Sequence, residues 1–302
     1  MQDNFSHELF AFRSKGKRSH KNELGIAEVY SWDEVEKLKP DLAFITNPTF
    51  AHIKTAFQCA SLGMHLFIEK PLSHSLKDIA SLEAICRKKK ITCYVAYCLR
   101  FHPVIKALRK LVLAKKIYHV RIDCSSYLPS WRKGTTSKDL YSGITSQGGG
   151  VLLDLSHEFD YIRYLFGEIK AMAGVYGKIS AVSFDSEDFA DVLLATRHAP
   201  HINLHLNFLS HMNERRIIID HEQGCLVGDL LGNKIEILNG HHKKTIRFTA
   251  TKDDYFKEQI KYFFRYLGNP LMMNNLKESK ATLTKILEFK RHGKKDFTNS
   301  LR

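Results

Sequence analysis

The sequence predicts an α/β protein built from a doubly wound parallel sheet, followed by an α+β domain with a mostly antiparallel, open sheet. Two observations lead to this fold class. Between residues 8 and 114, short apolar strands alternate with helical segments, which is typical of a parallel sheet covered on both faces. After residue 117, one long helix lies among many strands. Because 302 residues exceed one average domain, we expect two, divided as 1–103 and 104–302.

Local signals define the elements of the first domain. Ser31 followed by Glu34 predicts a capped start to a short helix, which Pro40 ends. Gly63 closes the next helix in the position that favours glycine. We expect strands at 8–12, 27–30, 41–46, 65–69 and 91–97, and helices at 31–39, 49–61, 75–88 and 102–114.

One helix organises the second domain. The glycine run 148–150 leads into a helix expected over 151–166, on which Asp154 and His157 share one face. The rest of this helix is apolar, and a buried charge needs a partner or a use. An aspartate and a histidine one turn apart suit acid–base chemistry near neutral pH. A satisfied structural pair in the core is the alternative. We expect strands at 120–127, 170–180, 188–196, 201–209, 214–220, 224–229, 234–238 and 244–249, and helices at 253–267 and 275–291.

The chain is strongly basic, with 46 Lys and Arg against 32 Asp and Glu and a formal net charge of +14. Excess positive charge attracts nucleic acid, nucleotide cofactors and acidic sugars alike. The basic residues are scattered and no zinc-finger, KH or RNP pattern occurs, so we expect a solvated basic surface and no nucleic-acid partner.

The six cysteines form no C-x-x-C pair, and several lie inside apolar runs. Free thiols in a reducing compartment fit this distribution better than a disulfide framework. Residues 1–7 lack a signal-peptide core, and no apolar run approaches the ~20 residues that a membrane span needs. We therefore expect a cytoplasmic protein without a membrane partner.

Alternating histidines in the strand expected at 201–209 raise the question of a metal site. His201 and His205 would lie about 13 Å apart along an extended strand, too far to share one ion. We therefore expect no metal and interpret the alternation as the polar face of a sheet.

Two strand-to-helix junctions carry the chemistry of the first domain. The segment 46–52 follows one strand, and Glu69-Lys70-Pro71 follows the next. Ligands of open α/β sheets bind at the carboxyl ends of the strands. A lysine held there by a following proline can polarise a hydroxyl or carbonyl oxygen, although a lone lysine at a strand end is usually a solvated charge.

These residues carry a family resemblance. Asn47-Pro48-Thr49 with His52, Glu69-Lys70-Pro71-Leu72, the segment 97–103, and Gly148-Gly149-Gly150 with Asp154, His157 and Asp160 resemble the Gfo/Idh/MocA family of nicotinamide-dependent oxidoreductases. The motifs occur in the family's order and cover most of the chain. The resemblance implies a Rossmann domain, a C-terminal α/β domain whose sheet often mediates oligomers, and hydride transfer between a C–OH group and NAD(P). We expect a homo-oligomer, a dimer or a tetramer, formed through that sheet.

The resemblance also implies residue roles. Lys70 would orient the reacting oxygen, His157 would exchange its proton, and Asp154 would hold the substrate or the histidine. The residues expected to bind the cofactor are Arg13, Ser14, Lys15, Thr46, Asn47, Pro48, His52, Glu69, Lys70, Pro71 and Arg100. Trp131 and Tyr141 join Asp154 and His157 as expected contacts of a sugar, cyclitol or sugar-acid substrate.

The sequence departs from the family at its start. The strand at 8–12 corresponds to the second strand of a dinucleotide fold, and no G-x-G-x-x-G loop precedes it. It must pair with the strand at 41–46 or leave backbone groups unpaired. Either a longer protein exists upstream of Met1, or this form binds cofactor poorly or not at all and serves as a binding or oligomeric protein.

The cofactor preference depends on the end of that strand. Arg13-Ser14-Lys15 stands where an acidic residue is expected for NAD, and cations there suit a 2′-phosphate. We favour NADP over NAD, with an exposed basic loop as the alternative.

Overall fold

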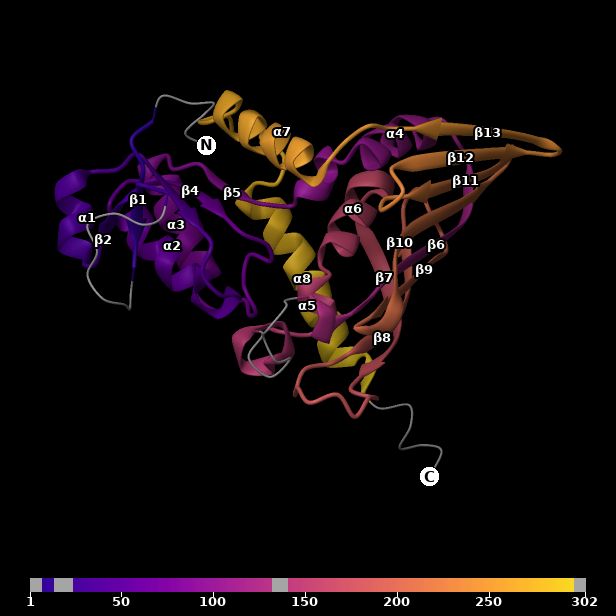
Figure 1. Cartoon of the computed structure of the whole chain (residues 1–302), viewed down its shortest axis with the longest axis horizontal. Helices are drawn as coiled ribbons and strands as arrows, with labels where there is room; N and C mark the ends of the chain where they lie inside the picture. The colour runs from indigo at the N-terminus through magenta and orange to yellow at the C-terminus, as the bar shows by residue number, and fades with distance from the viewer. Residues whose placement is uncertain (1–6, 14–23, 132–140, 296–302) are drawn as a thin grey trace.

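The computed structural model describes residues 7–13, 24–131 and 141–295. Figure 1 shows short parallel strands with their helices at one end of the molecule and a large sheet at the other, with helices between them. This arrangement confirms the predicted fold class: a parallel α/β part joined to a mostly antiparallel sheet.

The parallel part consists of two separate sheets. Strand β1 (Phe10–Phe12) pairs in parallel with β2 (Ala27–Val29). Strands β3 (Leu42–Ile45), β4 (His65–Ile68) and β5 (Cys93–Val95) form a second parallel sheet. The sequence required β1 either to pair with β3 or to leave backbone groups unpaired. In the described residues β1 does not pair with β3, so the two sheets remain unjoined.

Side chains of the three-stranded sheet alternate between two cores. On β4, Leu66 and Ile68 belong to the main core, which includes residues of α2 (His52–Ser61) and α3 (Ile79–Lys89). Phe67 points to the opposite face and meets Phe263 with ring centroids 5.3 Å apart. Because Phe263 lies on α7 (Lys252–Arg265), a helix from the end of the chain covers this face of the first sheet.

Helix α1 (Trp32–Leu38) starts as predicted, because the Ser31 hydroxyl accepts a hydrogen bond from the Glu34 backbone N–H. Two further long helices, α4 (Pro103–Val112) and α8 (Leu276–His292), belong to the second half of the molecule. Among the residues described, every helix is too short or too polar to traverse a bilayer.

The large sheet has nine strands in the order β13-β12-β11-β10-β6-β9-β8-β7-β14. The β6–β9 and β7–β14 pairs are parallel and all others are antiparallel. The strands are β6 (Ile117–Tyr127), β7 (Ile169–Gly177), β8 (Phe189–Thr196), β9 (Ile202–Asn207), β10 (Leu209–His221), β11 (Gly224–Asp229), β12 (Lys234–Asn239), β13 (His242–Arg247) and β14 (Lys294–Lys295).

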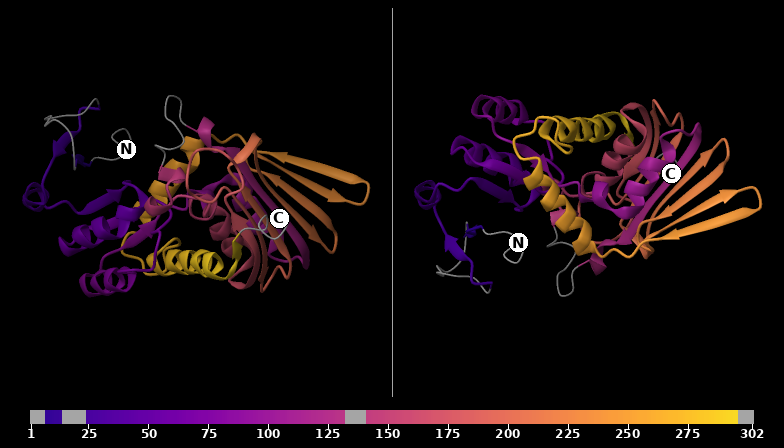
Figure 2. Two further views of the ribbon diagram at one scale, coloured as in Figure 1. Left: turned by 90° about the horizontal axis from the view of Figure 1, so that it is seen from below. Right: turned by 90° about the horizontal axis from the view of Figure 1, so that it is seen from above.

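One face of this sheet is covered and the other is open. Helices α4, α6 (His157–Phe166) and α8 lie on the side that faces the first domain, and no described helix lies on the opposite side (Figure 2). On β9, Ile202, Leu204 and Leu206 are buried, whereas Asn203 and His205 between them are partly exposed. The polar sheet face predicted from the alternating histidines is therefore present.

The prediction of one helix over 151–166 is wrong in one respect, because the structure has two helices in this range. Helix α5 (Val151–Asp154) ends one residue before Leu155, whose φ of −93° and ψ of 28° leave the helical region, and α6 (His157–Phe166) begins after Ser156. In an unbroken helix the Glu158 N–H would bond to the carbonyl of Asp154. It donates instead to the Leu155 carbonyl at 3.2 Å, which leaves the Asp154 carbonyl oxygen available.

Candidate active site

The side chain of Lys70, in the first domain, reaches Asp154 in the second. It lies two residues after the end of β4, and its Nζ donates to the backbone carbonyl oxygen of Asp154 at 2.6 Å. Its Nζ is also 3.6 Å from Asp154 Oδ1. The Lys70 side chain is 18% exposed and that of Asp154 is 2% exposed. The break between α5 and α6 thus has a direct consequence, because it frees the carbonyl that Lys70 binds.

Only one oxygen of the Asp154 carboxylate has a hydrogen-bond partner among the described residues. Its Oδ1 accepts a hydrogen bond from the hydroxyl of Tyr141 at 3.0 Å, whereas its buried Oδ2 has no partner among the described residues. Burial and the charge of Asp154 raise the pKa of Tyr141, so this phenol keeps its proton at neutral pH. A buried carboxylate oxygen without a partner is costly unless a ligand supplies the donor.

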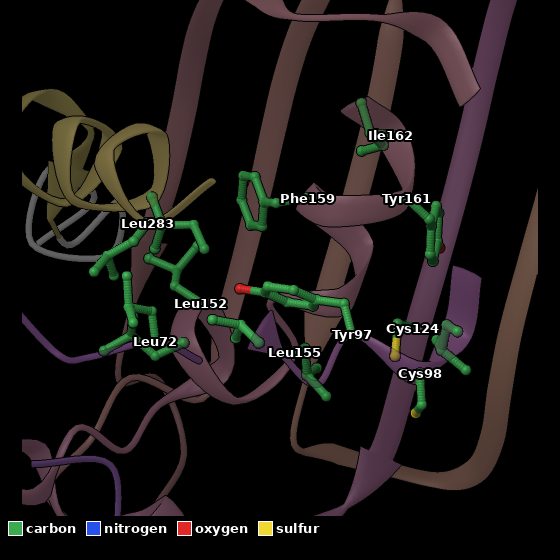
Figure 3. Packing of buried hydrophobic residues seen from close by; sticks show 14 of the residues in the cluster. Leu72, Tyr97, Cys98, Cys124, Leu152, Leu155, Phe159, Tyr161, Ile162 and Leu283 are labelled. Atoms are coloured by element: carbon green, nitrogen blue, oxygen red, sulfur yellow. The ribbon is translucent and has the colours of Figure 1, made fainter. Parts of the chain in front are cut away.

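His157 is the first residue of α6 and is 8% exposed. Its Nδ1 has no hydrogen-bond partner among the described residues. The ring packs edge-on against Tyr97, with centroids 5.6 Å apart. Figure 3 shows Tyr97 near Leu152, Leu155 and Phe159 in the core beside the site.

The charge state of His157 follows from its surroundings. Burial lowers its pKa well below the ordinary value of 6.5, and the positive charges of Lys70, Arg215 and Lys252 lower it further. The imidazole is therefore neutral at pH 7 and can accept a proton.

The predicted cofactor residues of the first domain lie at the ends of β3 and β4. Thr46 and Pro48 are exposed. Asn47 donates through Nδ2 to Thr55 Oγ1 at 2.8 Å, and its buried Oδ1 has no partner among the described residues. Burial raises the pKa of the Glu69 carboxyl, an effect that the charge of Lys70 opposes.

His52 and Pro71 connect these two loops. The Nδ1 of His52 lies 2.9 Å from the carbonyl oxygen of Pro71, and its Nε2 lies 2.8 Å from the carbonyl oxygen of Asn47. The peptide bond between Lys70 and Pro71 is cis.

Other predicted residues lie elsewhere. Arg100 is 5% exposed and forms a bidentate pair with Asp160 at 2.7 and 2.8 Å and a bond to Glu278 at 2.7 Å. The structure thus gives Arg100 a place in the core between the two domains. The Trp131 indole donates to Ser126 and packs on Phe208, and no described contact links it to Lys70 or Asp154.

Arg13 lies at the end of β1, and its Nε is 3.0 Å from a carboxylate oxygen of Glu28. Its side chain is 50% exposed. The predicted residues Ser14 and Lys15 lie outside the described part of the chain.

The residues present fit one end of a nicotinamide dinucleotide but not the other. The nicotinamide end fits, because the unpartnered Asn47 Oδ1 and the unpartnered groups of Asp154 and His157 offer polar contacts near Lys70. The pyrophosphate end does not match the usual pattern. In the described ranges, α1, α2 and α3 all begin without a glycine turn that could approach phosphate.

Three site residues were not predicted from the sequence. Tyr97 belongs to a family motif, but the motif assigned no role to it. In the structure its ring packs against the ring of His157. Arg215 comes from β10 and is held by Glu158 through bonds of 2.8 and 3.3 Å. Lys252 begins α7. Both cations come from segments distant in sequence, so no local pattern marks them.

The glycine run shapes the entrance to α5. A Cβ on Gly149 would lie 2.5 Å from the carbonyl oxygens of Tyr141 and Ser142. A Cβ on Gly150, whose φ is +109°, would lie 2.3 Å from the carboxyl carbon of Glu187. Gly149 faces backbone atoms that leave no room for a Cβ, and the positive φ of Gly150 favours glycine, so the run places α5 and its Asp154 beside Tyr141.

The parallel first domain, the open-faced second domain and the polar group at their junction define a two-domain α/β protein with its candidate site between the domains. A family model described as the oxidoreductase family with an NAD-binding Rossmann fold matches residues 2–97, and the model of the GFO/IDH/MocA C-terminal domain matches residues 106–227. The chain therefore belongs to the Gfo/Idh/MocA family of oxidoreductases.

The chain is similar in sequence to an inositol dehydrogenase and in fold to a sugar-nucleotide dehydrogenase. It is 30% identical to scyllo-inositol 2-dehydrogenase (NAD+) of Bacillus subtilis over 177 residues, which is 56% of this chain and 48% of that protein. The solved UDP-N-acetylglucosamine 3-dehydrogenase GnnA from Acidithiobacillus ferrooxidans superposes with a TM-score of 0.74 at 18% identity, covering 90% of this chain and 84% of that chain.

A second solved structure is the WlbA dehydrogenase from Bordetella pertussis in complex with NADH and UDP-GlcNAcA. It superposes with a TM-score of 0.71 at 18% identity, covering 89% of this chain and 81% of that chain. The matches to three curated relatives span 62%, 48% and 43% of their lengths. The chain thus spans about half the length of the curated relatives it matches.

Proposed function

We propose that this protein is an NAD(P)-dependent oxidoreductase that transfers a hydride between nicotinamide and a C–OH group of a sugar, cyclitol or sugar-acid derivative. One observation carries the proposal. The Lys70 ammonium meets Asp154 from the other domain, next to a buried and neutral His157 whose Nδ1 has no hydrogen-bond partner among the described residues. The family and its inositol and sugar-nucleotide dehydrogenases support the substrate class.

The nicotinamide supplies the hydride acceptor or donor when it is bound. Lys70 donates a hydrogen bond to the reacting oxygen, since an ammonium has three donors and only one is bound to the Asp154 carbonyl. The neutral His157 takes the hydroxyl proton in the oxidation direction and returns it in the reduction direction. The free Oδ2 of Asp154 accepts a bond from a neighbouring substrate hydroxyl.

The other predicted ligand contacts are assigned from where each residue lies relative to Lys70 and Asp154. Tyr141 orients the Asp154 carboxylate and borders the substrate, with Trp131 as a further substrate contact. Thr46, Asn47, Pro48, Glu69 and Pro71 line the nicotinamide half of the cofactor groove. The half-exposed guanidinium of Arg13, with Ser14 and Lys15 next to it in sequence, favours the 2′-phosphate of NADP over NAD.

Calorimetric titration with NAD and NADP, followed by nicotinamide reduction with a panel of sugars, cyclitols and sugar acids, tests the proposal. We expect tighter binding of NADP and turnover with at least one polyol. Binding of neither dinucleotide would contradict it.

The split parallel sheet favours a second candidate: a family member that keeps the fold and acts as a binding or oligomeric protein. The open polar face of the nine-stranded sheet would then join copies into a dimer or a tetramer, as we also propose for the enzyme. Six free cysteines favour a reducing compartment such as the cytoplasm. Oligomer formation without dinucleotide binding distinguishes this candidate from the enzyme.

A further inference from the structure

His52 lies between the two loops that carry the candidate site. It is 1% exposed and begins α2, at the point where the loop after β3 enters the helix. One ring nitrogen faces the carbonyl oxygen of Asn47 and the other faces that of Pro71, at 2.8 and 2.9 Å. Neither ring nitrogen is left for a ligand, so His52 cannot hydrogen-bond the cofactor directly in this arrangement.

Both partners of the His52 ring are carbonyl oxygens, which only accept hydrogen bonds. A neutral imidazole has one N–H and can satisfy one of them, whereas the imidazolium has two and satisfies both. The ring therefore ties one loop when neutral and both loops when protonated.

The surroundings of His52 oppose its protonation. Burial lowers its pKa below the ordinary 6.5, the carbonyls of Asn47, Pro71 and Leu72 oppose that shift, and the charge of Lys70 adds to it. Lys70, from the segment after β4, is the charged group that acts on the ring. The second hydrogen bond of the His52 ring therefore forms only when the pH falls below the ordinary pKa of histidine.

We propose that His52 is a positioning residue that fixes Lys70 relative to the loop 46–48. Pro71 follows Lys70 directly, so a bond to the Pro71 carbonyl restrains the residue next to the lysine. The Asn47 bond anchors the same ring to the loop expected to border nicotinamide. The neutral ring donates to one of the two carbonyls and the imidazolium to both, so His52 restrains Lys70 at the 2.6 Å contact with Asp154 most firmly when protonated, without touching the substrate.

This inference rests on the proposed function for the role of Lys70, but the strut itself can be observed without turnover. In protein labelled with ¹⁵N-histidine, the His52 ring is assigned by comparison with His52→Gln. We expect its N–H to exchange slowly, and both ring nitrogens to become protonated at acidic pH in the folded protein. Fast exchange like that of the exposed His242, or one protonated nitrogen down to acid unfolding, would overturn the strut.

Kinetics then separate positioning from direct cofactor contact. His52→Leu removes every hydrogen bond from this ring to the two loops, and a displaced Lys70 lowers kcat by about 10²-fold while the calorimetric Kd for NADP changes much less. His52→Gln keeps an N–H donor and recovers part of the loss, and His242→Gln is the matched control with unchanged kcat. A loss confined to cofactor affinity would show that His52 acts on the ligand instead. A wild-type protein with slow-exchanging His52 N–H and no turnover would retain the strut and contradict the proposed function.

Discussion

At the scale of single residues, the backbone carbonyl of Asp154 is as important as its carboxylate. Because the helix breaks after this residue, the carbonyl points to Lys70 rather than to the next helical turn. One donor of the lysine is fixed there, and its side chain is only 18% exposed, so its remaining donors have few competing water molecules. A lysine held in this way is preorganised for a substrate oxygen.

The lowered pKa of His157 predicts the pH dependence of catalysis. In the direction of alcohol oxidation His157 must be neutral, so kcat/KM stays flat through neutral pH and falls only as the pH drops below the ordinary 6.5. His157→Gln is expected to lose about 10²–10⁴-fold in kcat and this acidic limb. An acidic limb that survives in the variant would mean that another group is the base.

The same shift affects stability, with a definite sign. The folded pKa of His157 lies below the unfolded value, so the unfolded state binds the proton more readily. The stabilisation is complete above about pH 6.5 and is lost as the pH falls from there through the lowered folded value. Urea midpoints over this range should fall less steeply for His157→Gln than for the wild type.

At the scale of elements, the entrance to α5 depends on the backbone of Gly150, at φ +109° and ψ 155°. Only glycine adopts this conformation readily, and Glu187 fills the space of a Cβ. We expect Gly150→Ala to lower the free energy of unfolding by about 2 kcal/mol or more. Gly240→Ala, with φ +55° and open space around its Cβ, is the control and should cost about 1 kcal/mol. Equal urea midpoints would contradict the steric explanation.

Contacts between elements also hold the domains together. Arg100, on the segment after β5, binds Asp160 of α6 and Glu278 of α8 in the buried interior. Arg100→Ala leaves Asp160 unpaired, and we expect a loss of about 3–5 kcal/mol in urea unfolding. Lys106→Ala breaks an ion pair to Glu258 whose two side chains are about half exposed, and it should cost less than about 1 kcal/mol. Similar losses in both variants would rule out Arg100 as the stronger link between domains.

At the scale of the whole molecule, hydrophobic patterning was sufficient for the fold class and most elements. Alternation on β9 and the capped start of α1 were both confirmed. The break between α5 and α6 could not be predicted, because apolar periodicity continues through it and the lysine that binds the freed carbonyl comes from the other domain.

The same limit applies to long-range packing. Helix α7 covers the first sheet through Phe263, although it follows the second domain in sequence. The division at residue 103 remains a prediction, and the structure adds that the end of the chain returns to the first domain. The family motifs predicted Lys70 and Asp154 at one site, and the structure places Lys70 Nζ 3.6 Å from Asp154 Oδ1. The surroundings of Arg100 and the cations near His157 could be identified only from the structure.

The most direct measurement is a double-mutant cycle on the rate of nicotinamide reduction with Lys70→Ala and His157→Ala. Both side chains are assigned to one substrate oxygen, so removing either makes the other far less useful. We expect each single variant to lower kcat by about 10²–10⁴-fold, and the double variant to be within about tenfold of the slower single variant. Losses that multiply in full would contradict a shared site for Lys70 and His157.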